Sequence, residues 1–183
     1  MGDLAQEEIL AFFNKLSQYY DSPANIYLLG GSALCLLGSP RRTIDIDITL
    51  DSSLENKIEL DEAIKSVADK MHLELEIIPI SEFIPVPDGS HLRHRLIERI
   101  GSMSLYVFDP YTISISKIAR GFETDLQDVL YLLRNGIVEI NRLNEFVEQT
   151  IPVAWEYDID PAEMKNYFAE VKKHLSSGAS ISP

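Results

Sequence analysis

Cationic side chains and cysteine are scarce in this sequence. Lysine and arginine supply 16 of the 183 residues against 29 aspartates and glutamates, so the formal net charge is -13. Because phosphate binding over a broad surface needs clustered Lys and Arg, this balance argues against an extended nucleic-acid-binding face. The single cysteine, Cys35, lies in an apolar stretch and is interpreted as a small buried side chain. Arginines do gather locally, at 41–42 and over 91–99, where an anion site is compatible with the acidic remainder.

Long apolar runs are also missing. No stretch approaches the roughly 20 residues that a membrane-spanning helix requires, and the first residues lack the basic and apolar regions of a signal peptide. We therefore expect a cytoplasmic protein without a membrane partner. A hydrophobic content of 45% and a charged content of 25% are ordinary for a globular chain, and the length suits one well-buried core with a helical extension.

The periodicity of apolar residues predicts mixed helices and strands in the first half. Asp3 is expected to cap a helix that reaches Tyr20, and a small-residue helix is expected at 32–37. The segment "DSSLENK" is expected to cap a further helix that ends near Met71. Strands are predicted at 26–29, 43–50 and 73–80.

The second half begins with a proline-rich loop and then becomes helical. "RLIERI", "GSMS" and "LYVF" predict a hairpin over 95–108, although 92–100 is also compatible with a short helix. Helices are predicted at 109–121, 124–136, 141–150 and 161–175. The fold class is therefore α+β, with a core over 1–108, a helical part over 109–175 that packs on it, and a disordered tail over 176–183.

Asp45 and Asp47 stand on one face of a predicted strand, because Ile44, Ile46 and Ile48 alternate with them. Two carboxylates this close repel each other unless a cation neutralises them. Ligand sets made of oxygen alone favour Mg²⁺, and two such ions suit in-line phosphoryl displacement. The pair therefore indicates phosphoryl or nucleotidyl transfer, although a solvated edge strand shows the same pattern.

Two glycines precede this strand in the segment "YLLGGSALCLLG". Gly30 and Gly31, between a strand and a helix that starts near Ser32, let backbone N–H groups approach a phosphate closely. A carboxylate from a neighbouring strand would complete a metal site. Glu76 is the first candidate and Glu74 the second, because both lie on one face of the next strand.

This combination resembles the nucleotidyltransferase superfamily that includes polymerase beta, in which a Gly-Gly or Gly-Ser turn precedes an Asp-x-Asp strand. The match lies in "LLGGSALCLLGSPRRTIDIDI". Together with "DPYTISISKIARGFETDLQDVLYLLRNG" it also resembles the AbiEii-like and related uncharacterised bacterial nucleotidyltransferase-like proteins, some of them toxins of toxin–antitoxin pairs. The resemblance covers about 26–136 and implies a mixed sheet flanked by helices.

The resemblance also implies roles for individual residues. Gly31 and Ser32 would hold the triphosphate, and Asp45 and Asp47 would bind Mg²⁺. Lys117 would reach a nucleotide phosphate, and either Asp125 or Asp128 would supply the acidic position that follows it. Further residues considered for phosphate or nucleotide contact are Arg42, which flanks the strand as well, and Arg120, which lies three residues after Lys117 on one predicted helix.

The expected function is transfer of a nucleoside monophosphate from a nucleoside triphosphate to an RNA end, a protein hydroxyl or a small molecule. Asp45, Asp47, Glu76 and Lys117 are the candidate catalytic residues. The alternative is an inactive nucleotide sensor or a protein-binding module on the same fold. The acidic composition favours a basic protein partner. The resemblance separately implies an antitoxin-like protein as a candidate partner.

Overall fold

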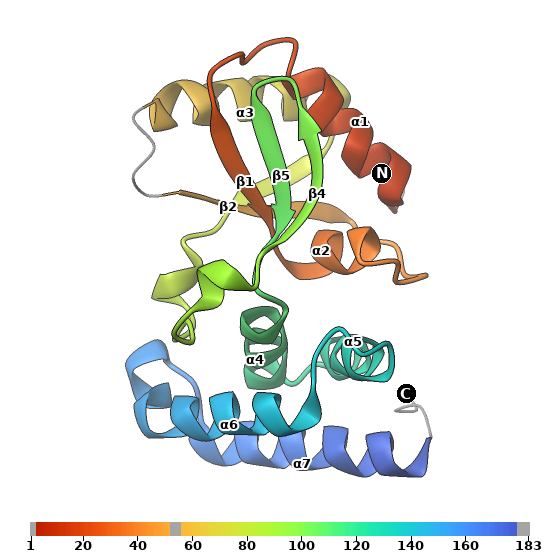
Figure 1. Cartoon of the computed structure of the whole chain (residues 1–183), viewed down its shortest axis with the longest axis vertical. Helices are drawn as coiled ribbons and strands as arrows, with labels where there is room; N and C mark the ends of the chain where they lie inside the picture. Colours follow the sequence, from red (N-terminus) through yellow and green to blue (C-terminus); the bar gives the residue numbers. More distant parts are fainter. Residues whose placement is uncertain (1–2, 52–55, 179–183) are drawn as a thin grey trace. The chain divides into compact units, whose positions relative to one another are not determined.

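The computed structural model describes residues 3–51 and 56–178 (Figure 1). By their mutual contacts these residues form two units. The first unit contains the described residues up to Pro79 together with His94–Phe108. The second contains Ile80–Arg93 and the described residues from Asp109 onward. The segment 80–93, which precedes the last two strands in the chain, thus groups with the C-terminal helices.

A five-stranded mixed sheet forms the centre of the first unit. Its strands in chain order are β1 (Ala24–Leu28), β2 (Asp45–Leu50), β3 (Glu74–Ile77), β4 (Arg95–Ile100) and β5 (Met103–Val107). They are arranged in the order β3-β2-β1-β5-β4. The β1–β5 and β2–β3 pairs are parallel, and the β1–β2 and β4–β5 pairs are antiparallel. The α+β class with a mixed sheet is therefore confirmed, as is the hairpin over β4 and β5.

Helices cover one face of this sheet. The helices of the first unit are α1 (Gln6–Leu16), α2 (Gly30–Leu36) and α3 (Lys57–Met71). Helices α1 and α3 pack against each other, with α3 behind the strands in the view of Figure 1, and α2 packs along β2. Ile46 and Ile48 of β2 are fully buried, which confirms the predicted alternation there. Ile44 is 66% exposed, contrary to the expectation, because β2 begins only at Asp45.

Two helix starts differ from the sequence-based expectation. Helix α1 follows an extended Ala5, whose backbone N–H donates to the Glu8 carboxylate at 2.7 Å. Asp3 is therefore not the cap, because Glu8 already satisfies a donor at this end of the helix. Helix α2 includes both glycines and begins at Gly30 rather than near Ser32. The expected cap before α3 lies mostly outside the described residues, which resume at Asn56.

The second unit is helical, as predicted. Its helices are α4 (Pro110–Arg120), α5 (Glu123–Arg134), α6 (Ile140–Thr150) and α7 (Pro161–Ser177). Short 3-10 turns occur at Ile80–Glu82, Ser90–Leu92 and Ile151–Tyr157. Helix α7 includes residues 176 and 177, which the sequence placed in the tail, and 179–183 lie outside the described residues. Helix α4 contacts α5, α6 and α7 and is the central helix of this unit.

An ion pair explains why the segment 80–93 belongs to the helical unit. Arg93 donates to both carboxylate oxygens of the fully buried Asp109, at 3.0 and 2.7 Å. The same guanidinium donates to the carbonyls of Pro87 and Asp88 and lies 4.9 Å from the Phe146 ring centre. Asp109 is also the N-cap of α4, as predicted. One of the arginines considered for an anion site is thus engaged in holding this segment.

Candidate functional site

Asp45 and Asp47 lie on the face of β2 that is opposite to the helix-covered face. Both are partly exposed, whereas Ile46 between them is fully buried. The Thr43 hydroxyl donates to Asp45 Oδ1 at 3.1 Å. This contact orients one of the two carboxylates, and sequence reasoning missed Thr43. The sequence signal for this contact is a threonine two residues before the first aspartate, at the distance where strand side chains share a face.

Both candidates for the third carboxylate lie beside the aspartates. In the parallel β2–β3 ladder Asp45 pairs with Glu74 and Asp47 pairs with Glu76. Parallel neighbours in register present side chains to the same face, so each glutamate accompanies one aspartate. In the part of the chain that the structure describes, no three His, Cys, Asp or Glu side chains are close enough together to hold a metal ion. The strand register thus places one glutamate beside each aspartate and does not single out either as the third carboxylate.

Gly30 allows the Asp47 carboxylate to lie against the turn. Its φ is +51°, and a Cβ atom there would lie 2.1 Å from Asp47 Oδ2. At Gly31 a Cβ would lie 2.4 Å from the Thr43 hydroxyl oxygen. Sequence reasoning assigned both glycines to close approach of a phosphate. The structure gives them a further role, which is to leave room for two side chains of the site.

Ser32 links the glycine turn to β2 through hydrogen bonds of its hydroxyl group. It is fully buried, and its hydroxyl donates to the carbonyl of Leu29 at 2.9 Å and to that of Asp47 at 3.3 Å. The Leu29 N–H also donates to the Asp47 carbonyl at 2.8 Å. These bonds fix the backbone that carries the Asp47 carboxylate. The Ser32 hydroxyl is thus engaged with backbone, and a triphosphate contact by this residue stays a prediction.

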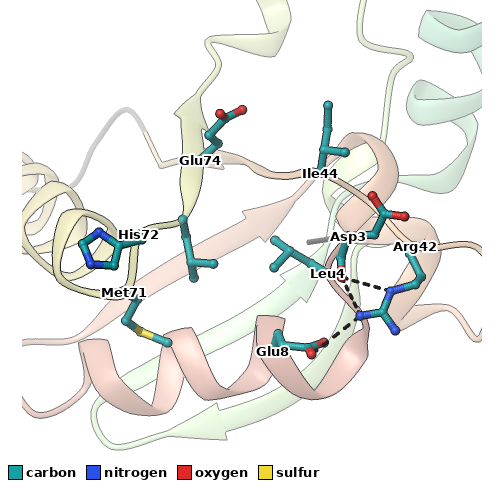
Figure 2. A pocket seen from close by; sticks show the side chains of 9 residues that line it. Asp3, Leu4, Glu8, Arg42, Ile44, Met71, His72 and Glu74 are labelled. Carbon is teal, nitrogen blue, oxygen red and sulfur yellow. Dashed lines mark hydrogen bonds and ion pairs between the residues drawn. The ribbon is translucent and has the colours of Figure 1, made fainter. Parts of the chain in front are cut away.

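Arg42 contacts the N-terminal segment. Its guanidinium donates to the Asp3 carbonyl at 2.9 Å and lies 3.6 Å from the Glu8 carboxylate. Figure 2 shows these contacts at the rim of a pocket of about 520 Å³, which Ile44 and Glu74 also line. Of the two interpretations of Arg42, these contacts fit a residue that flanks the strand. A phosphate contact stays a prediction.

The cationic and acidic residues of the C-terminal motif form a buried network in the second unit. Lys117 on α4 is 3% exposed and donates to Asp125 at 2.9 Å and to Asp128 at 2.7 Å, both on α5. Arg120 donates to the same oxygen of Asp125 at 2.7 Å. The second oxygen of Asp125 is buried and accepts no hydrogen bond from the residues that the structure describes. Both acidic candidates therefore bind Lys117, whose ammonium is held within this unit.

An aromatic cluster occupies the same face of the sheet as the aspartates. The Tyr27 ring centre lies 5.4 Å from that of Tyr106 and 4.6 Å from that of His94. The His94 ring lies 4.5 Å from Phe108. Burial raises the pKa of Tyr27, and the nearby Asp51 carboxylate adds to this shift. Sequence reasoning missed this cluster. Its signal in the sequence is the alternation of Tyr106 in β5 with Phe108 just after it.

The face of the sheet opposite to α1 and α3, called the open face below, thus combines paired carboxylates, a glycine turn packed on one of them, and aromatic rings. The α+β fold, with its five-stranded mixed sheet and C-terminal helical region, is nucleotidyltransferase-like. Over residues 6–176 the chain matches the family DUF6036, described as a nucleotidyltransferase of unknown function, and it belongs to that family. No curated protein and no solved structure matches the chain. The broader resemblance to nucleotidyltransferases is thereby confirmed, and the AbiEii-like one stays a prediction.

Among residues 3–51 and 56–178, no helix combines the length and the apolar character needed to span a membrane.

Proposed function

We propose that this protein transfers a nucleoside monophosphate from a nucleoside triphosphate to a hydroxyl group, with Asp45 and Asp47 as the Mg²⁺-binding residues. The observation that carries the proposal is the packing of Gly30 against the Asp47 carboxylate, beside Asp45 on an open sheet face. Membership of a nucleotidyltransferase family supports the same reaction class. Glu76 is proposed as an assisting carboxylate because it pairs with Asp47 across the β2–β3 ladder.

The donor set fits a hard cation. Mg²⁺ prefers oxygen ligands and is usually bound by one or two carboxylates together with substrate phosphates, so two aspartates are sufficient on the protein side. When bound, such ions stabilise the attacking and the leaving oxygens of an in-line displacement. Asp45 and Asp47 would hold them, and Glu76, which is exposed beside Asp47, would assist.

The residues around the aspartates supply preorganisation. Thr43 holds the Asp45 carboxylate at 3.1 Å, and Ser32 holds the backbone of Asp47 at 3.3 Å. In the reaction, the acceptor oxygen forms a bond to the α-phosphorus while the bond to pyrophosphate breaks, and the hydroxyl proton is released to water. Carboxylates that are oriented before the substrate arrives need no reorganisation during this step.

The net charge narrows the class of acceptor without identifying the molecule. A net charge of -13 disfavours an RNA acceptor that needs a broad basic surface and favours a basic protein or a small molecule. An antitoxin-like protein would be such a basic partner.

A second candidate is a nucleotide-binding or protein-binding module without turnover. It is favoured by the engagement of two expected phosphate ligands with acidic groups. Lys117 binds Asp125 and Asp128, and Arg42 faces Glu8. A module of this kind would bind nucleotide and release no pyrophosphate.

The first test is calorimetric titration of each ribonucleoside triphosphate into the wild type and Asp47→Asn, with and without Mg²⁺. We expect Mg²⁺-dependent binding that Asp47→Asn weakens at least tenfold, because the variant removes one of the two metal-binding charges. Asp69→Asn removes an equal charge from the exposed side of α3 and should bind like the wild type. Melting temperatures should agree within a few degrees.

The outcomes separate the candidates. Binding that depends on Mg²⁺ and Asp47, together with pyrophosphate release when an acceptor is supplied, supports transfer. The same binding without pyrophosphate release from any acceptor class supports the binding module. Binding that is equal in Asp47→Asn and the wild type overturns the metal-site assignment.

A further inference from the structure

Two adjacent rows of side chains cross the open face of the sheet. In the first row Glu76 lies beside Asp47 in the β2–β3 ladder. In the second row Thr49 pairs with Tyr27, and Tyr27 pairs with Tyr106. The carboxylate row and the tyrosine row are thus two residues apart along β2. The aromatic cluster described above begins immediately beside the proposed metal-binding residues.

The rings of this cluster form a continuous surface. Tyr27 and Tyr106 stack with their planes 27° apart, and the His94 ring lies against Tyr27 at 4.6 Å. Phe108 meets Tyr27 edge-on, with ring centres 6.0 Å apart. The four rings come from two neighbouring strands and from the residues that flank β4 and β5. Strand pairing therefore holds them in place before any ligand binds.

Three of these four rings are not part of the sheet's core, whereas Phe108 is buried. Ile26 and Leu28, which flank Tyr27 on β1, are 1% and 0% exposed because they face the helices. Tyr27, Tyr106 and His94 each keep part of their surface accessible. Aromatic groups that were needed only for packing would be expected to be as buried as their neighbours. Partly open rings beside carboxylates can instead accept a further planar group.

We propose that Tyr27 and Tyr106 form the stacking surface for the nucleobase of the triphosphate whose phosphates bind at Asp45 and Asp47. This inference rests on the proposed function. Tyr27 lies on the strand next to β2 and pairs with Thr49, two residues after Asp47. Ordinary strand geometry therefore separates the Cα atoms of Asp47 and Tyr27 by about 8 Å. A nucleotide bridges such a gap with its sugar, which places its base over the rings.

Stacking predicts weak selectivity among bases. Every base has a π-face, and stacking on an aromatic side chain contributes about 1–3 kcal/mol per base. Because larger rings overlap more, purine nucleotides should bind more tightly than pyrimidine nucleotides. No pattern of hydrogen bonds is needed for this preference.

The test compares ATP with inorganic tripolyphosphate in the presence of Mg²⁺, by calorimetry on the full chain. The wild type should bind ATP about 5- to 150-fold more tightly, which is the stacking range converted to affinity. Tyr27→Leu and Tyr106→Leu should lose most of that ratio while tripolyphosphate affinity stays unchanged. Tyr106→Phe keeps a ring and should retain the ratio. Tyr19→Leu, which removes an exposed tyrosine from the loop after α1, is the matched control.

The possible results of this test distinguish the stacking proposal from the transfer proposal. Equal affinity for ATP and tripolyphosphate in the wild type overturns the stacking surface and leaves nucleotidyl transfer standing. A leucine variant that weakens both ligands alike, at an unchanged melting temperature, also overturns it. If the leucine variants do not fold, Tyr106→Trp should tighten ATP and leave tripolyphosphate unchanged, and weaker ATP binding by this variant would contradict the proposal. Absence of Mg²⁺-dependent binding of either ligand overturns the transfer proposal and this inference together.

Discussion

At the scale of single residues, the absence of a side chain at Gly30 determines where the Asp47 carboxylate lies. Gly30 combines a positive φ of +51° with a contact to Asp47 that leaves no room for Cβ. Positive φ alone costs a residue with a Cβ about 1–2 kcal/mol. The close contact adds a second penalty, which is displacement of the Asp47 carboxylate. Backbone conformation and site geometry are therefore coupled at this position.

Gly30→Ala should lower stability and also weaken Mg²⁺-dependent triphosphate binding. Gly136→Ala is the matched control, because Gly136 has a φ of +64° and its Cβ would meet no described residue within 4 Å other than its chain neighbours. It should cost only about 1–2 kcal/mol and bind normally. Chemical denaturation and calorimetry measure the two effects. Normal binding by a folded Gly30→Ala variant would contradict the proposed coupling.

At the scale of elements, helices α4 and α5 are joined by buried charges. Lys117 faces two carboxylates that are 3% and 5% exposed, at Asp125 and Asp128. Isolated charges in such surroundings are costly, so removing one partner from a buried, hydrogen-bonded network is strongly destabilising. The network therefore has a structural role that does not depend on the predicted nucleotide contact of Lys117.

Lys117→Met should destabilise the protein by about 3–5 kcal/mol, because it leaves two buried carboxylates without their shared cation. Adding Asp128→Asn to this variant should restore part of the loss. Arg120→Gln should cost about 0–1 kcal/mol, since Arg120 is 53% exposed and Asp125 keeps Lys117 as its partner. Urea denaturation of the three variants provides the comparison. A Lys117→Met variant with wild-type stability would show that the network contributes little.

At the scale of the whole molecule, the order of segments in the chain differs from their grouping in space. The chain leaves the first unit after Pro79, returns at His94 and leaves again after Phe108. Arg93 and Asp109 stand at the last two of these crossings and bind each other through two hydrogen bonds. One ion pair thus attaches the segment 80–93 to the N-terminal end of α4.

Arg93→Gln should release the segment 80–93 from the helical unit. Asp109 is fully buried, so removing its cationic partner should cost about 3–5 kcal/mol. Hydrogen exchange of backbone amides in 80–93 should accelerate more than exchange in the sheet of the first unit. Arg99→Gln changes an exposed arginine on β4 and should alter neither region. Unchanged exchange in 80–93 would mean that the ion pair does not hold the segment.

The sequence by itself determined the local structure where periodicity and end signals agreed. Strand alternation predicted the buried Ile46 and Ile48, and an Asp-Pro start with a Gly end predicted α4. The carboxylate pair Asp45 and Asp47 was identified as a candidate site because its spacing requires only the strand period of two. Boundaries were less well predicted, as at the starts of α1 and α2, because alternative caps and turns have similar free energies.

Only the tertiary structure decided which distant residues meet. No local pattern specifies that Glu76 pairs with Asp47, that Tyr27 stacks on Tyr106, or that Lys117 is buried between two carboxylates. These contacts depend on the order β3-β2-β1-β5-β4 and on the packing of α4 against α5. Strand order and helix packing arise from burial of apolar surface contributed by the whole chain, which a short sequence window does not encode.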